Sequence, residues 1–221
     1  MTEQRDHRVV LAGALCWILT VQYFIVQPVV AAAWPTPYSY LNNYISDLGN
    51  TACGPLAHAP IMARHVCSPL HGLMNASFVA LGLLTAAGAG LARWGLPRGW
   101  LTTTSMVLLG LSGIGVIVVG FAPENVAPSL HLVAAIAQVP PKFIAMALLA
   151  TATWRSQRRI ALWTSGCGAL ALAGSALYLS RLDPGLGVGG VERLALDPFT
   201  IWTVGLGYAL LRGKLHDRGV V

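Results

Sequence analysis

Apolar residues in this chain gather into long stretches that are separated by short polar connections. The segment 9–33 contains no charged residue. A helix needs about 20 mainly apolar residues to cross the roughly 30 Å hydrocarbon layer of a bilayer. Segments of suitable length and composition lie at 9–33, 70–92, 100–121, 130–154, 160–180 and 194–211. The pattern predicts an all-α fold, a polytopic membrane bundle of six transmembrane helices that forms a single membrane domain over residues 1–221.

Composition supports a membrane protein and argues against a soluble one. Of the 221 residues, 55% are hydrophobic and 10% are charged, whereas soluble domains carry about 25% charged residues. The first apolar segment lacks a small-x-small cleavage site followed by a soluble domain, so we expect a retained helix and not a signal peptide. The net charge of +6 comes from basic residues at the ends of the segments, which indicates membrane orientation and no nucleic-acid partner.

The distribution of basic residues predicts how the chain is oriented. Lys and Arg are enriched in cytoplasmic loops. Most of them fall in the N-terminal segment, two alternate turns and the C-terminal tail: Arg5, Arg8, Arg93, Arg98, Arg155, Arg158, Arg159, Arg212, Lys214 and Arg218. The opposite loops hold Arg64, Arg181 and Arg193, and Lys142 lies inside the fourth segment. We therefore expect a multi-pass protein of the cell (plasma) membrane with cytoplasmic N- and C-termini.

Two of the four cysteines fall in the first extracytoplasmic loop. An oxidising compartment favours a disulfide between Cys53 and Cys67, and closing a loop of about 15 residues contributes about 3 kcal/mol. Metal binding by this pair is the alternative, although no CxxC pair supports it. Cys16 and Cys167 lie within apolar segments and are expected to be packing residues.

The stretch 38–49, "YSYLNNYISDLG", is polar although it directly follows the first apolar segment. As a helix it would place Asn43 and Asp47 on one face and its apolar residues on another. This division is typical of a short interfacial helix, here on the extracytoplasmic side. Either the helix is only an interfacial anchor, or it folds over the mouth of the bundle and directs Asp47 toward Arg193 and His131.

Other polar residues are expected at the same membrane level. His71 and Asn75, one helical turn apart, open the second segment, and Glu124 precedes His131 in the third loop. Ionisable groups at membrane depth are costly unless they pair or serve a cavity, so their coincidence predicts a polar pocket. The candidate binding residues are Asn43, Ser46, Asp47, His71, Asn75, Glu124, His131 and Arg193.

Glu192 and Arg193 precede the sixth segment, which we expect to begin near Asp197. Arg193 is either a binding residue of the pocket or a structural residue that neutralises Asp47 or Glu124. Lys142 follows two prolines inside the fourth segment, where it either snorkels, bonds a carbonyl freed by the prolines, or lines a cavity.

Three short motifs carry a resemblance to a known family. They are "NNYISDLG" at 42–49, "VGFAPE" at 119–124 with His131 after it, and "GGVER" at 189–193. In these features the chain resembles the prokaryotic membrane proteins grouped as domain of unknown function 998, and more loosely the Frag1/DRAM/Sfk1-like membrane proteins. The resemblance extends over about residues 9–211.

That family has a six-helix type of architecture and no generally established function. The resemblance implies that functional residues lie among Ser46, Asp47, His131, Glu192 and Arg193. The chain departs from the family where Ala122-Pro-Glu124 replaces a Phe-Pro-Asp type of sequence. The disulfide is not expected across the family.

Three functions stay open on the sequence alone. The favoured one is a non-enzymatic protein whose polar extracytoplasmic pocket binds a lipid or a membrane partner. The first alternative is an intramembrane lipid-directed enzyme of the hydrolase type, acting by metal or acid–base catalysis. Its catalytic residues would be Asp47, His131, Glu192 and Arg193. A small transporter is the second alternative, because prolines occur in the first and fourth segments, the corresponding positions of a possible inverted repeat.

No cofactor is favoured by the sequence. Zinc is the possible exception, with Asp47, His71 and His131 as the ligands. The expected partners are membrane lipids, with a membrane-protein partner or a homo-oligomer as further possibilities.

The expected orientation can be tested with a reporter fused after Val221. A reporter that works only in the cytoplasm should be active there, and one that works only in the periplasm should be silent, because the basic loops hold the termini inside. Activity of the periplasmic reporter would contradict the orientation.

Overall fold

The computed structural model describes residues 2–56 and 64–216. Its elements are α1 (Thr2–Leu19), α2 (Gln22–Ala32), the 3₁₀ turn η1 (Ser46–Gly49), β1 (Gly54–Leu56), β2 (Arg64–Val66), α3 (His71–Ala92), the 3₁₀ turn η2 (Arg93–Gly95), α4 (Trp100–Phe121), α5 (Pro128–Ala137), α6 (Val139–Thr153), α7 (Arg158–Ser180) and α8 (Gly187–His216). In the described part of the chain, six helical stretches are long and apolar enough to cross a membrane. The predicted all-α polytopic bundle is confirmed.

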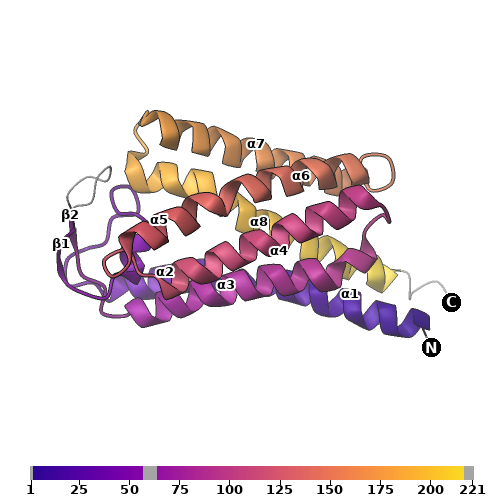
Figure 1. Cartoon of the computed structure of the whole chain (residues 1–221), viewed down its shortest axis with the longest axis horizontal. Coiled ribbons are helices and arrows are strands. Elements are labelled where there is room, and N and C mark those ends of the chain that lie inside the picture. The colour runs from indigo at the N-terminus through magenta and orange to yellow at the C-terminus, as the bar shows by residue number, and fades with distance from the viewer. Residues whose placement is uncertain (1, 57–63, 217–221) are drawn as a thin grey trace.

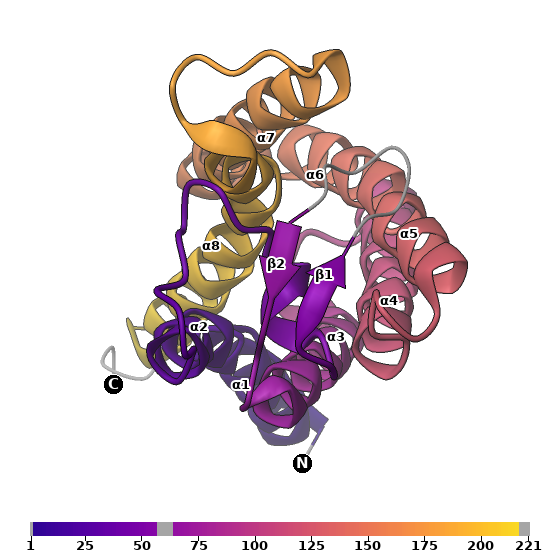
Figure 2. The ribbon, with the colours of Figure 1, turned by 90° about the vertical axis from the view of Figure 1, so that its left-hand side faces the viewer.

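The helices lie side by side in an elongated bundle with two different ends (Figure 1). The start of α1 and the end of α8 lie together at one end, as the sequence predicts. At the other end, residues 34–56 and 64–70 form a structure that we call the cap. Within the cap, β1 and β2 pair antiparallel, with Gly54 opposite Val66. Figure 2 shows this hairpin over the end of the bundle, between α5 and α8.

Two of the six spans are interrupted, and local chemistry explains where. The first consists of α1 and α2, and the Thr20 hydroxyl at their junction bonds the Trp17 carbonyl at 2.6 Å. Such a side-chain bond back to the preceding turn bends a helix. The fourth consists of α5 and α6, which meet at Gln138. Pro140 and Pro141 cannot donate backbone hydrogen bonds, so a new helix begins at this point.

The predicted interfacial helix over 38–49 is wrong. Only Ser46–Gly49 forms a 3₁₀ turn, and the preceding residues form turns and bends. The Asn43 side chain accepts from Ser39 N at 3.1 Å, and the Asp47 carboxylate accepts from Tyr44 N at 3.0 Å. These side-chain bonds replace the backbone bonds of a helix, which is why Asn, Asp and Ser favour turns.

The sixth span also begins earlier than the sequence predicts, at Gly187. The Asp183 carboxylate accepts from the backbone N–H groups of Gly185 and Gly187, both at 2.9 Å. These bonds satisfy backbone donors where the helix begins. Asp197 and Pro198 therefore lie inside α8 and do not start it.

Small residues allow the helices to pack closely. A Cβ atom at Gly174 of α7 would lie 2.4 Å from the backbone of Leu194 and Ala195 in α8. A Cβ at Gly82 of α3 would lie 2.4 Å from the Gly113 carbonyl oxygen of α4. Glycines at such positions let helix backbones approach in lipid, and they hold the bundle that carries the cap.

Candidate functional site

The cap is fixed to the bundle by a buried ion cluster. The Arg64 Nε atom of β2 lies 2.7 and 2.9 Å from the two carboxylate oxygens of Asp47. Its Nη2 atom lies 3.0 Å from Glu124 Oε2, in the α4–α5 loop. The side chains of Asp47 and Glu124 are 0% and 4% exposed, and that of Arg64 is 10% exposed. One guanidinium therefore joins two carboxylates that water scarcely reaches.

Further hydrogen bonds complete this cluster. Asp47 accepts from Asn43 Nδ2 at 3.1 Å, and Glu124 accepts from the Ser46 hydroxyl at 2.9 Å. Burial acts to lower the pKa of Arg64, but the hydrogen bonds and charges of Asp47 and Glu124 outweigh it and raise that pKa. The guanidinium also lies 4.6 Å from the centre of the Tyr44 ring.

The expected pairing of Asp47 with Arg193 or His131 is wrong, because Arg64 occupies the carboxylate. Arg64 lies in the same loop as the two cysteines, between them in sequence. The predicted disulfide places Arg64 in a closed loop near the cap. The sequence alone does not indicate which carboxylate Arg64 pairs with.

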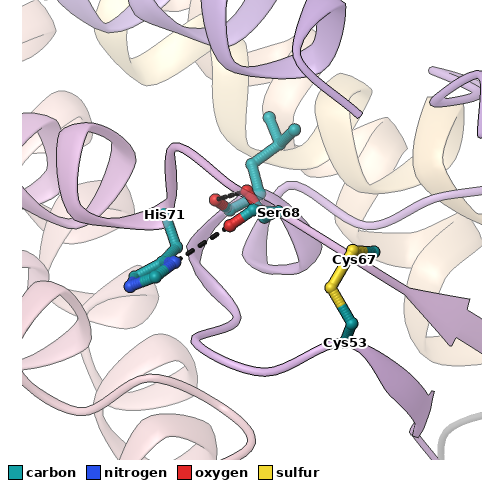
Figure 3. Close-up of a disulfide and its surroundings, with 5 residues drawn as sticks. Cys53, Cys67, Ser68 and His71 are labelled. Atoms are coloured by element: carbon teal, nitrogen blue, oxygen red, sulfur yellow. Dashed lines mark hydrogen bonds between the residues drawn. A yellow bond between two sulfur atoms is a disulfide. The ribbon is translucent and has the colours of Figure 1, made fainter. Parts of the chain in front are cut away.

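The disulfide between Cys53 and Cys67 is confirmed. It joins the residues that flank β1 and β2, and so closes the hairpin that carries Arg64 (Figure 3). Next to it, the Ser68 hydroxyl donates to the Leu48 carbonyl at 2.7 Å. The covalent link and this hydrogen bond hold the two parts of the cap together.

His71 and Asn75 hold the base of the cap. His71 Nδ1 lies 2.9 Å from the Ser68 carbonyl oxygen (Figure 3), and Asn75 Nδ2 donates to the Gly49 carbonyl at 2.9 Å. The sequence suggested Asp47, His71 and His131 as zinc ligands. Among the side chains of residues 7–56 and 64–213, no three His, Cys, Asp or Glu residues gather as metal ligands.

Glu192 and Arg193 bind the backbone of the cap from α8. Glu192 Oε2 accepts from Ile45 N at 2.6 Å. Arg193 Nη1 donates to the carbonyls of Tyr40 and Asn43 at 3.0 and 3.1 Å. Arg193 therefore does not neutralise Asp47 or Glu124, as one interpretation of the sequence held.

The glycines before this pair allow the cap to reach the helix. Gly187 has a φ of +67°, and a Cβ at Gly189 would lie 2.1 Å from the Asn43 carbonyl oxygen. Gly189 N also donates to the Leu41 carbonyl at 2.8 Å. Arg193 further bonds the Tyr38 hydroxyl, whose pKa is raised by burial although the arginine charge acts to lower it. The motif "GGVER" is thus a docking surface for the cap.

Beneath the cap lies a chamber of about 70 Å³ inside the bundle. Ile45 and Ser46 of the cap form its roof. Its other polar lining residues are Tyr23, His131, Gln138, Lys142, Glu192 and Thr200. Its apolar lining includes Phe78, Leu81, Val116 and Val119. The chamber is not fully enclosed. It combines ionisable and apolar walls, as small-molecule sites commonly do.

The structure divides the candidate residues between two places. Asp47, Asn43 and Glu124 belong to the cluster that fixes the cap, whereas His131 and Glu192 line the chamber. Ser46 belongs to both. The His131 ring is buried, and its Nδ1 atom lies 2.8 Å from the Ala122 carbonyl oxygen.

Lys142 lies deepest among the ionisable residues of the chamber. Its Nζ atom donates to Gln138 Oε1 at 2.6 Å. Of the three interpretations open on the sequence, the structure supports a cavity-lining lysine. Thr200 and the Tyr23–Asp197 hydrogen bond of 3.2 Å could not be predicted from the sequence, because single polar residues within apolar helices give no local signal.

Replacing Arg64 tests the ion cluster. Arg64→Met would leave Asp47 and Glu124 buried without their guanidinium, and breaking a buried ion pair in this way costs about 3–5 kcal/mol. The change in unfolding free energy should be measured by denaturant titration in detergent. The control is Arg181→Met, which removes an exposed arginine at the same end of the bundle. Asp47→Asn should restore part of the loss in the Arg64→Met background. Equal changes in unfolding free energy for Arg64→Met and the control would contradict a stabilising role of the ion cluster.

Comparison with known proteins places the chain in a family. Residues 10–209 match the family described as protein of unknown function (DUF998). No curated protein matches the chain, and no solved structure does so either. The match covers most of the chain, including the cap and every helix that lines the chamber. The protein is therefore a multi-pass membrane protein that belongs to the DUF998 family.

Proposed function

We propose that this protein binds a membrane amphiphile, with the polar head of the ligand in the chamber beneath the cap. The observation that carries the proposal is the mixed lining of the chamber. Lys142, Glu192 and His131 face the same space as Phe78, Leu81 and Val116. A site that is lined by both ionisable and apolar residues suits a molecule with a polar head and a hydrocarbon chain. Because the site lies within membrane-spanning helices, membrane lipids are the amphiphiles that surround it.

The cap end is proposed to face the outside of the cell. The basic residues of the opposite end support this orientation, and so does the Cys53–Cys67 disulfide, which persists in oxidising compartments. The ligand would then come from the outer leaflet of the plasma membrane.

An enzyme that acts on the bound lipid is the second candidate, and one observation favours it. A carbonyl oxygen can only accept a hydrogen bond, so the contact with Ala122 puts a proton on Nδ1 of His131. In the neutral ring, Nε2 is then free of a proton and can act as a base. Turnover of an added lipid by the wild type, lost in His131→Gln, would favour this candidate over binding alone.

Filling the chamber tests the binding proposal. Ala135 lines the chamber, so Ala135→Phe should occupy the space and reduce the lipid that stays bound. Ile136, next to it, is 59% exposed on the outside of α5, so Ile136→Phe is the matched control. Native mass spectrometry of protein purified in mild detergent should find retained lipid in the wild type and the control, and a severalfold loss in Ala135→Phe.

A thermal unfolding scan should accompany the spectra to show that each variant is folded. Equal lipid retention in folded Ala135→Phe and wild type would contradict the chamber as the site, and no lipid retained by any form would contradict lipid binding.

A further inference from the structure

We propose that the ligand of the chamber is an acidic amphiphile, whose carboxylate or phosphate is held by Lys142 while its chain leaves the bundle between α5 and α8. This inference rests on the proposed function and specifies the class of ligand. Its support comes from the partners of Lys142, the size of the chamber and the arrangement of the surrounding helices.

Lys142 has fewer hydrogen-bond acceptors around it than its ammonium group can bind. An ammonium group has three N–H donors. In the described residues, Lys142 makes one hydrogen bond, to Gln138, and a contact of 5.1 Å with the centre of the Phe199 ring. No carboxylate in that part of the chain forms an ion pair with it. A charge at membrane depth is costly unless it is paired, and an acid group on the ligand would supply the missing partner.

Glu192 is the acid that lines the same chamber, but it is engaged elsewhere. Its Oε2 atom accepts from Ile45 N at 2.6 Å, which ties it to the roof. Of the other ionisable residues that line the chamber, His131 donates from Nδ1 to the Ala122 carbonyl and Tyr23 donates to Asp197. Lys142 is therefore the ionisable residue of the chamber with N–H donors left for an acid group.

The volume of the chamber limits the head group. At about 70 Å³, it has about half the volume of an engineered cavity of about 150 Å³ that holds benzene. A carboxylate or a single phosphate is of the right size, whereas a whole phosphocholine group is too large. The apolar residues Ala135 of α5 and Leu196 of α8 would contact the first carbons of the chain.

The helices around the chamber leave one side less closed than the others. On the α2 side, Tyr23 of α2 bonds Asp197 of α8 at 3.2 Å. Helix α3 packs against α2 and α4, and α4 packs against α5. In contrast, α5 packs mainly on α4 and α6, while α8 packs mainly on α7 and α1. Both α5 and α8 line the chamber, through Ala135 and Leu196.

Closer to the other end of the bundle, the ring contact of Phe143 in α6 with Phe199 in α8, at 5.1 Å, closes this side again. The roof is closed by the bonds of Ile45 and Ser46. Among the described residues, the least closed side therefore lies between α5 and the first half of α8.

The test compares ligands that differ only in their acid group. Purified protein in a non-ionic detergent is titrated with oleic acid and methyl oleate, and separately with dioleoyl phosphatidate and dioleoylphosphatidylcholine. The bound fraction is measured by native mass spectrometry. The wild type should bind each acid at least tenfold more tightly than its neutral or zwitterionic counterpart. This comparison needs no variant.

Variants then assign the preference to one residue. Lys142→Met keeps the length of the side chain without its charge, and it should remove the tenfold preference. The matched control is Arg181→Gln, which removes an exposed charge and should leave the preference unchanged, because general attraction of anions to a basic protein would be reduced equally by both changes. Inorganic phosphate should not displace the acidic lipid at millimolar concentration.

The outcomes separate this inference from the function on which it rests. If acid and ester bind equally well, the inference is overturned and lipid binding stands; Lys142 then serves only as a donor to Gln138. An acid preference that survives in Lys142→Met also overturns the inference. Displacement of the lipid by inorganic phosphate would indicate that the ligand is a free anion and would contradict the claim that it is an amphiphile. If none of the four lipids binds, both this inference and the proposed function are contradicted.

Discussion

The salt-bridged contact of Arg64 with Asp47 and Glu124 is the interaction on which the structure of the cap end depends. Two carboxylates that are almost fully buried would be strongly destabilising without a cation between them. Arg64 suits this role because its planar guanidinium donates several hydrogen bonds in a fixed geometry. Since Asp47 belongs to the cap and Glu124 to the α4–α5 loop, the same arginine sets the distance between the cap and the bundle.

Two further interactions stabilise the position of the cap. The Cys53–Cys67 disulfide closes the hairpin, so Arg64 lies on a constrained pair of strands. Across the bundle, Glu192 and Arg193 of α8 bind the cap backbone through a carboxylate and a guanidinium. The cap is thus attached at both sides of the chamber. Ser46 and Glu192 both attach the cap and line the chamber, whereas Asp47, Arg64 and Arg193 only attach the cap. Polar residues that look alike in sequence therefore lie in different places: Asp47 belongs to the ion cluster, whereas Lys142 lines the chamber.

The sequence predicted the bundle well because membrane spans follow from length and hydrophobicity, which are local properties. It predicted the disulfide because the redox compartment follows from topology. It failed where the structure depends on contacts between distant segments. The helix expected over 38–49 is absent because the Asn43 and Asp47 side chains satisfy the backbone of a turn instead. The partner of Asp47 could not be identified because Arg64 lies on a hairpin that no periodicity indicated. The chamber could not be located, since it depends on how α2, α3, α4, α5, α6 and α8 meet the cap.

We infer that the cap covers a chamber in which Lys142 meets the acid group of a membrane amphiphile. The decisive measurement is a cryo-electron microscopy structure of the protein purified from membranes without delipidation. We expect Arg64 to lie between Asp47 and Glu124, and continuous density to run from hydrogen-bond distance of Lys142 Nζ to the lipid side of the bundle between α5 and α8. A chamber without such density, with Glu192 paired directly to Lys142, would contradict it, as would a cap detached from the bundle with Arg64 in water.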